Sequence, residues 1–163
     1  MTLNSNSSEL DIYSDGSCHT RYRVGGWAAI IWIGGKKIVL TGIVPGSTNN
    51  RMELTAVIKA LVYVRENYAT IKTIKIYSDS QYVIGLPGRK EKLMASGFST
   101  KKGNQIPNSD LVIELLEQLT FFSVEWKKIK AHQKNSSKDN YNIEADKLSR
   151  KKVREAVRSD IPA

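Results

Sequence analysis

The tripeptide Tyr-Ser-Asp occurs twice in the sequence, each time at the end of a short apolar run typical of a β-strand. The first copy closes "LDIYSD" at Asp15, and the second closes "IKIYSD" at Asp79. In α/β sheets, ligands collect outside the carboxyl ends of the strands, and adjacent strands lie about 4.8 Å apart. If these two strands are parallel neighbours, their aspartates reach one ion. Two unpaired carboxylates that close repel each other, so a hard cation is the natural compensation.

The apolar pattern predicts three consecutive strands and two later ones. Residues 10–14 suit a strand, and the continuously apolar "GWAAIIWI" at 26–33 suits a strand covered on both faces. "KKIVLTG" at 36–42 is its expected hairpin partner across Gly34-Gly35, and 73–79 and 122–131 give two more strands. The expected architecture is α/β, with a five-stranded mixed sheet of three antiparallel and two parallel strands, flanked by helices.

Helices are expected between and after these strands. Apolar residues recur at the helical period from Leu54 to Val62, after start signals at 47–50. A short helix should begin near Ser80, another at 107–110, and a last one near Asn142 after a polar loop at 133–140. Residues 87–106 are expected to be irregular and basic.

Composition indicates one basic domain. We expect it to span 10–158, between a polar tail at 1–9 and a short tail at 159–163. A formal net charge of +9 and a pI near 9.6 indicate an acidic partner, most commonly nucleic acid and next a polyanionic membrane surface. Because the first ten residues lack signal-peptide features and no apolar run reaches membrane-spanning length, we expect a cytoplasmic protein without membrane association. The single cysteine, Cys18, is consistent with a reducing compartment.

Two further acids, Glu53 and Asp146, are candidates for the same site. Glu53 lies on the flank of the apolar stripe of the first long helix. Asp146 lies early in the last helix, with Asn142 one turn before it on the same face. Helix starts and strand ends are rigid platforms for such groups.

Each of the four acids also has a structural interpretation. Asn50 and Glu53 have the spacing of a capping box, Asp15 could be a turn residue, and Asp79 could cap the next helix. Asp146 could be a solvated helix acid. The complete set of four, rather than any one of them, favours a functional site.

Six segments resemble the type 1 ribonuclease H family and occur in the family's order. They are "YSDGSC", "GGWAAII", "STNNRMELTAVIKAL", "YSDSQYVI", "WKKIKAH" and "NIEADKLSR". The resemblance spans roughly residues 10–152, and "TNNRMEL" and "YSDSQYV" are its most specific parts. It implies a ribonuclease H-like fold and endonucleolytic cutting of the RNA strand of RNA–DNA hybrids, leaving 5′-phosphate and 3′-hydroxyl ends.

The resemblance also implies the catalytic roles. Asp15, Glu53, Asp79 and Asp146 are expected to bind two Mg²⁺ ions, for which Mn²⁺ could substitute. An all-carboxylate site suits Mg²⁺, which is held by a few acids, substrate phosphate and water. His132 is expected to carry a proton or to aid product release near the leaving group, with a surface loop histidine as the alternative. The loop between His132 and Asp146 is longer than is usual in the family.

The protein is expected to be a monomer, and the resemblance implies that it binds the hybrid through amides along the minor groove and through cations along the phosphates. An RNA strand is told from DNA through its 2′-hydroxyls, and amides suit this task because they both donate and accept. Thr48 and Arg51 look like the family's contacts with DNA phosphates. Capping or turn chemistry is the alternative for Asn49 and Asn50, and a surface ion pair is the alternative for Arg51. The expected contacts are Cys18, Arg21, Arg23, Thr48, Asn49, Asn50, Arg51, Gln81, Arg89, Lys90, Lys92, Lys101, Lys102 and Asn142.

The sequence departs from the family at two places. "CHTRYRVGG" at 18–26 carries Arg21 and Arg23 where relatives often carry an Asn-Pro-Gly turn, and we expect these arginines to strengthen phosphate binding on the RNA side. The segment 87–102 takes the place of the family's basic protrusion. Its only aromatic residue is Phe98, where relatives often carry tryptophans, so weaker stacking on sugars is expected.

Three alternative functions stay open at this point. The chain could be the ribonuclease H domain of a retroelement reverse transcriptase. The charge alone would also fit a non-catalytic, basic nucleic-acid-binding module. A transposase or integrase core can share the fold and the acidic site but lacks "NNRMEL".

Overall fold

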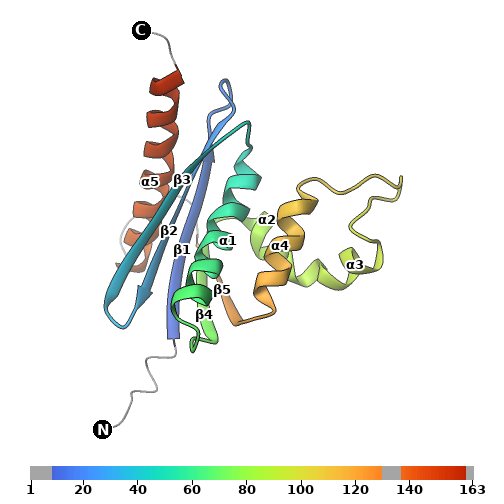
Figure 1. The fold of residues 1–163 in the computed structure, drawn as a ribbon, viewed down its shortest axis with the longest axis horizontal. Helices are drawn as coiled ribbons and strands as arrows, with labels where there is room; N and C mark the ends of the chain where they lie inside the picture. Colours follow the sequence, from blue (N-terminus) through green and yellow to red (C-terminus); the bar gives the residue numbers. More distant parts are fainter. Residues whose placement is uncertain (1–8, 130–136, 161–163) are drawn as a thin grey trace.

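The structure is a computed structural model that describes residues 9–129 and 137–160. A five-stranded sheet runs through it in the order β3-β2-β1-β4-β5 (Figure 1). Strand β2 pairs antiparallel with both β1 and β3, and β4 pairs parallel with both β1 and β5. The predicted mixed sheet is therefore confirmed. The strands are β1 (Glu9–Cys18), β2 (Val24–Ile33), β3 (Lys36–Pro45), β4 (Thr73–Ser78) and β5 (Ser123–Lys128).

Helices cover both faces of the sheet, which explains the continuous burial of its central strands. Successive side chains of a strand point to opposite faces. Ile12 of β1 packs into the larger core, beneath α1 (Asn49–Asn67) and α4 (Ser109–Leu119), whereas Tyr13 packs beneath α5 (Ser137–Asp160). Figure 1 shows α5 on one side of the sheet and α1 and α4 on the other. Both faces of β1 are thus fixed by packing.

Hydroxyl side chains begin the two helices nearest the predicted acids. Thr48 is the N-cap of α1, and its Oγ1 accepts a hydrogen bond from the amide of Arg51 at 3.2 Å. Ser80 is the N-cap of α2 (Gln81–Gly85), and its Oγ accepts from the amide of Val83 at 3.2 Å. Each cap satisfies a donor of the first turn that has no partner within the helix. The capping interpretations of Glu53 and Asp79 are therefore wrong.

The structure also corrects three element boundaries. Strand β1 continues to Cys18 because it keeps pairing with β2, so Asp15 lies inside a strand rather than at its end or in a turn. The expected irregular segment contains the 3₁₀ turn η2 (Pro87–Arg89) and α3 (Lys90–Ala95). Helix α5 begins at Ser137, inside the polar stretch expected to be a loop.

None of the helices within 9–129 and 137–160 combines the length and the apolar composition that crossing a membrane requires.

Candidate metal centre

The two Tyr-Ser-Asp segments lie side by side in matching register. Tyr13 of β1 and Tyr77 of β4 are partners in the parallel pairing, and their rings stack with centroids 4.4 Å apart and planes 9° apart. Asp15 and Asp79 each follow two residues later. Tyr13 and Tyr77 are the last paired residues of these two parallel strands. The equal offset therefore places both aspartates next to each other, just beyond the point where the pairing ends.

Glu53 of α1 completes a cluster of three acids from three separate elements. Asp15, Glu53 and Asp79 each offer a carboxylate oxygen, and these three oxygens all lie within 4.8 Å of one another. Gly16 allows α1 to approach β1 this closely, because a Cβ on Gly16 would collide with the backbone of Met52 and Glu53. The convergence predicted from the sequence is confirmed for these three acids.

Asp146 approaches the cluster from α5, on the other side of the sheet. Its negative charge acts on Asp15 and contributes to raising the pKa of that carboxyl. Its own carboxylate accepts a hydrogen bond from Nε of Arg150 at 3.0 Å, one turn later in the helix. Asp146 therefore faces the cluster without belonging to the three-acid group defined by the 4.8 Å distances.

Burial and mutual repulsion shift the protonation of these acids. Burial, together with the charges of Asp79 and Asp146, raises the pKa of Asp15 to about 7, while the hydrogen bond from Ser149 acts in the opposite direction. Burial and the charges of Asp15 and Asp79 also raise the pKa of Glu53. Like charges in a poorly solvated site disfavour ionisation, and a bound cation reverses this effect.

The donor set of the cluster fits a hard divalent cation. Its ligand atoms are all carboxylate oxygens, which Mg²⁺ and Mn²⁺ accept readily, whereas zinc sites usually contain cysteine or histidine. Oε2 of Glu53 is buried without a hydrogen-bond partner in the described part of the chain. An unpartnered, buried carboxylate oxygen beside two further carboxylates is the arrangement that a cation would stabilise.

Two of the expected phosphate contacts have structural roles in the protein. Thr48 caps α1, as described above. Arg51 forms a two-pronged ion pair with Asp110 at the start of α4, with N–O distances of 3.0 and 2.8 Å. The ion pair is the alternative that the sequence left open for Arg51, and contact of either residue with DNA stays a prediction.

The remaining expected contacts near the cluster lie on two segments: the end of β1 with the β1–β2 loop, which follows Asp15, and the first turn of α1, which precedes Glu53. We call these two segments the rim of the cluster. Asn49 and Asn50 are exposed in the first turn of α1, and Arg21 and Arg23 are exposed in the β1–β2 loop. Cys18 Sγ lies 3.1 Å from the carbonyl oxygen of Ser47, so this part of the rim is tied to the start of α1.

Gln81 of α2 and Asn142 of α5 differ in accessibility. Gln81 is exposed at the start of α2, where Oε1 accepts a hydrogen bond from Nζ of Lys128 at 2.7 Å. Asn142 is 5% exposed, and its Oδ1 has no partner among the residues that the structure describes. Asn142 belongs to α5, and its burial was not expected for a substrate contact.

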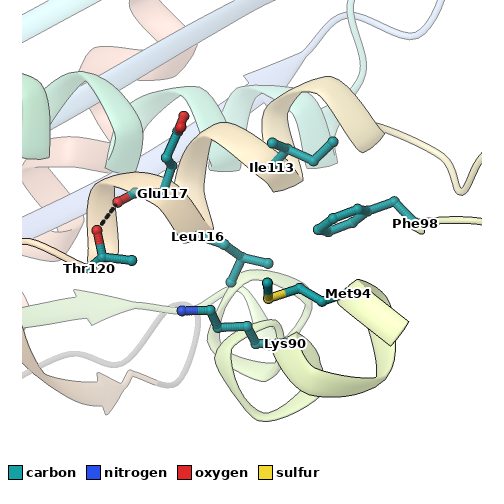
Figure 2. Close-up of a pocket in the computed structure, with 7 residues that line it drawn as sticks. All are labelled: Lys90, Met94, Phe98, Ile113, Leu116, Glu117 and Thr120. Carbon is teal, nitrogen blue, oxygen red and sulfur yellow. Dashed lines mark hydrogen bonds between the residues drawn. The ribbon is translucent and has the colours of Figure 1, made fainter. Parts of the chain in front are cut away.

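The basic segment, residues 87–102, projects away from the sheet (Figure 1). Arg89, Lys92, Lys101 and Lys102 are exposed there, and Lys90 is half-buried. Phe98 packs against the main core, beside an apolar groove of about 240 Å³ between α3 and α4. Figure 2 shows Phe98 and Met94 facing Ile113 and Leu116 across this groove. The ring of Phe98 thus packs the basic segment against the main core and α4.

Two further residues concern the site, the predicted His132 and the unpredicted Ser149. His132 lies outside the described residues, so its role stays a prediction. Ser149 was missed: its Oγ donates a hydrogen bond to Oδ2 of Asp15 at 2.7 Å across 134 positions of sequence. Its position three residues after Asp146, on the same helical face, was the available signal.

Comparisons with known proteins agree with the geometry. The RNase H family model matches residues 7–154. The ribonuclease H of Moorella thermoacetica is 35% identical over 157 residues, which cover 95% of this chain and 98% of that protein. The ribonuclease H of Wolbachia sp. subsp. Drosophila simulans is 37% identical over 149 residues, which cover 91% and 97%.

A solved structure shows the same fold. LC9-RNase H1, described as a type 1 RNase H with the type 2 active-site motif, superimposes with a TM-score of 0.73 at 22% sequence identity. The match covers 91% of this chain and 75% of that chain. Together with the family model and the relatives above, it confirms the resemblance inferred from the six sequence segments. The chain belongs to the RNase H family of nucleases.

Proposed function

We propose that this protein is an endonuclease that hydrolyses the RNA strand of RNA–DNA hybrids with two Mg²⁺ ions, leaving 5′-phosphate and 3′-hydroxyl ends. The observation that carries the proposal is the convergence of Asp15, Glu53 and Asp79, whose carboxylate oxygens lie within 4.8 Å of one another. Membership of the RNase H family and names of relatives at about 35% identity support the same activity.

The acids would hold the ions from both sides of the sheet. Asp15, Glu53 and Asp79 would bind one ion where they converge, and Asp146 would contribute from α5. Two such ions, held by these acids, would supply the positive charge that activates the attacking water and stabilises the leaving oxygen. The rigid elements that carry the acids keep them in place before the substrate arrives.

The hybrid would lie across the rim of the cluster. Asn49, Asn50 and Gln81 would face the minor groove, where the 2′-hydroxyls distinguish RNA from DNA. The exposed cations of the basic segment would contact phosphates of the DNA strand, in keeping with the net charge of +9. His132 would move a proton near the leaving group.

A cleavage assay with end-labelled substrates tests this proposal. The wild-type protein should cut RNA in an RNA–DNA hybrid only when Mg²⁺ or Mn²⁺ is present, and should leave duplex RNA and duplex DNA intact. Asp15→Asn and Asp79→Asn should each lower the rate at least about a thousandfold, because each removes a charge that binds the ions. Undiminished cutting by either variant would refute the assignment.

The same assay separates the alternatives. Salt-sensitive hybrid binding without metal-dependent cutting would indicate a non-catalytic binding module. Joining of DNA ends instead of RNA hydrolysis would indicate a transposase or integrase. Analysis of the product ends, by labelling with and without prior phosphatase treatment, checks for the 5′-phosphate.

A further inference from the structure

The hydroxyl of Ser149 links the last helix to the first strand. Ser149 is fully buried in α5, and its Oγ lies 2.7 Å from Oδ2 of Asp15 and 3.0 Å from the carbonyl oxygen of Asp146. A hydroxyl has one proton to donate, and an ionised carboxylate can only accept. The shorter contact, to Asp15, is therefore the main hydrogen bond of the Ser149 hydroxyl.

A glycine on β2 makes this contact possible. Gly26 faces α5, and a Cβ at this position would collide with the carbonyl oxygen of Ser149 and would lie 3.1 Å from Cβ of Lys152. The absence of a side chain lets α5 lie directly on the sheet at this level. Gly26 pairs with Ser17 in the sheet, two residues beyond Asp15. The close approach thus occurs next to the acid that Ser149 contacts.

We infer that Ser149 is a positioning residue for metal binding: its hydroxyl orients the carboxylate of Asp15 and at the same time holds α5 against the sheet, so that Asp146 faces the cluster. The inference rests on the proposed function, because it assigns Ser149 to the site where the ions would bind. Ser149 itself does not touch the ions or the substrate.

The spacing of Ser149 and Asp146 explains how one contact can set both acids. Residues three positions apart in a helix lie on the same face. When Ser149 is bonded to Asp15, the preceding turn of α5 is fixed beside β1, and Asp146 projects from that turn. Groups that hydrogen-bond to metal ligands fix the orientation of those ligands, and their removal typically lowers metal affinity about 10- to 100-fold.

Calorimetric titration of the full-length protein with Mn²⁺ alone tests the inference. Ser149→Ala removes the hydroxyl and should weaken Mn²⁺ binding about tenfold or more. Ser149→Thr keeps the hydroxyl and should restore most of the affinity. Ser159→Ala is the matched control, because Ser159 lies on the same helix and its hydroxyl donates to the backbone carbonyl of Glu155, at 3.0 Å, its one hydrogen bond within residues 9–129 and 137–160. This control should bind Mn²⁺ like the wild type.

Cleavage kinetics give a second readout that a merely structural role would not produce. In Ser149→Ala the Mn²⁺ concentration for half-maximal cleavage should rise by a factor similar to the loss of affinity, and the rate at saturating Mn²⁺ should change less. Hybrid affinity, measured without metal, should stay at the wild-type value.

The outcomes separate this inference from the proposed function. If the wild type binds Mn²⁺ and cuts the hybrid while Ser149→Ala binds Mn²⁺ within about twofold of the wild type, the positioning role is refuted and the nuclease proposal stands, since the expected loss is at least about tenfold. A fall in rate at saturating Mn²⁺ with unchanged metal affinity also refutes it. A wild type that neither binds Mn²⁺ nor cuts refutes the proposed function itself.

Discussion

Gly16 of β1 lies directly against the backbone of Glu53 in α1. A side chain on Gly16 would overlap the amide nitrogen of Glu53 and would lie 2.7 Å from Cβ of Met52. The amide of Gly16 also donates a hydrogen bond to the Glu53 carboxylate, which favours its ionised form and acts to lower the pKa that burial raises. The place of Glu53 beside Asp15 therefore depends on a residue that has no side chain.

Gly16→Ala should separate Glu53 from the other acids. Because backbone atoms block the added methyl group, α1 has to shift, and we expect a loss of about 1–3 kcal/mol in the free energy of unfolding. Mn²⁺ affinity and hybrid cleavage should fall at least about tenfold. Urea unfolding, calorimetry and the cleavage assay measure the three effects.

Gly85→Ala is the control for this substitution. A Cβ on Gly85 meets no atom within 4 Å, and the residue ends the short helix α2. Stability and cleavage should therefore stay close to the wild-type values. Equal effects of the two substitutions would show that close packing at Gly16 does not position Glu53.

The metal-free protein should become less stable as the pH rises from about 4 to 7. The pKa of Asp15 is raised from 3.8 to about 7 in the folded state, so over this range the folded state binds more protons than the unfolded state. Stability rises with pH only where the unfolded state binds more protons, and here the sign is the reverse. The favourable contribution is complete below about pH 4 and is lost by about pH 7.

Thermal unfolding at several pH values, with and without Mg²⁺, measures this effect. Added Mg²⁺ should raise Tm at pH 7 much more than at pH 4, because it binds the ionised acids of the folded state. Asp15→Asn should flatten the pH dependence in the absence of metal. A wild-type Tm that rises steadily from pH 4 to 7 without metal would contradict the electrostatic account of the cluster.

Neutralising the basic segment should weaken hybrid binding and reduce its dependence on salt. We expect the slope of log affinity against log salt to fall by about 0.9 for each phosphate contact that is lost. The variant replaces Arg89, Lys90, Lys92, Lys101 and Lys102 with glutamine. Fluorescence anisotropy with a labelled hybrid over a range of KCl concentrations gives the slope.

Two lysines at the opposite end of the strands provide a control for this variant. Lys36 is the first residue of β3, Lys72 directly precedes β4, and both are exposed. These amino-terminal ends lie across the sheet from the carboxyl-terminal end of β4, where Asp15 and Asp79 meet. Replacing both with glutamine should leave the salt slope unchanged. The same slope in the basic-segment variant and the wild type would show that the segment does not touch the phosphates.

His132→Ala should slow turnover while hybrid binding is retained. A proton carrier near the leaving group typically contributes about 10²–10⁴-fold to the rate. We expect the lower end of this range because the sequence between His132 and Asp146 is longer than is usual in the family. Single-turnover and steady-state cleavage rates, compared with hybrid affinity, give the answer. A rate equal to that of the wild type would return His132 to the class of surface loop residues.

The sheet could be predicted because its apolar runs and turn signals are local. The four acids were favoured only as a set and through the family resemblance, since each of them alone also fitted a structural role. The two Tyr-Ser-Asp segments indicated equivalent positions on two strands. The apolar stripe of α1 indicated which side of this helix, and with it Glu53, faces the sheet. The boundary of β1 could not be predicted from the same letters. Pairing with β2 extends the strand through Gly16, a residue whose local preference indicates a turn.

Contacts between distant segments account for the features that the sequence did not predict. The ion pair of Arg51 with Asp110 and the hydrogen bond of Ser149 with Asp15 join residues far apart in the chain, and in neither case does the local sequence indicate which residue is the partner. The burial of Asn142 likewise depends on the face that α5 turns to the sheet. Such features follow from tertiary packing rather than from the properties of single segments.

Because α5 follows all five strands in the chain, the site is completed only after the sheet has been synthesised. Asp15, Glu53 and Asp79 all precede residue 80, and every strand of the sheet is synthesised before α5. A nascent chain that already holds the first three acids still lacks Asp146 and the hydroxyl of Ser149. Cutting activity should therefore appear only after α5 has been synthesised and has packed against β1, the first strand to be made.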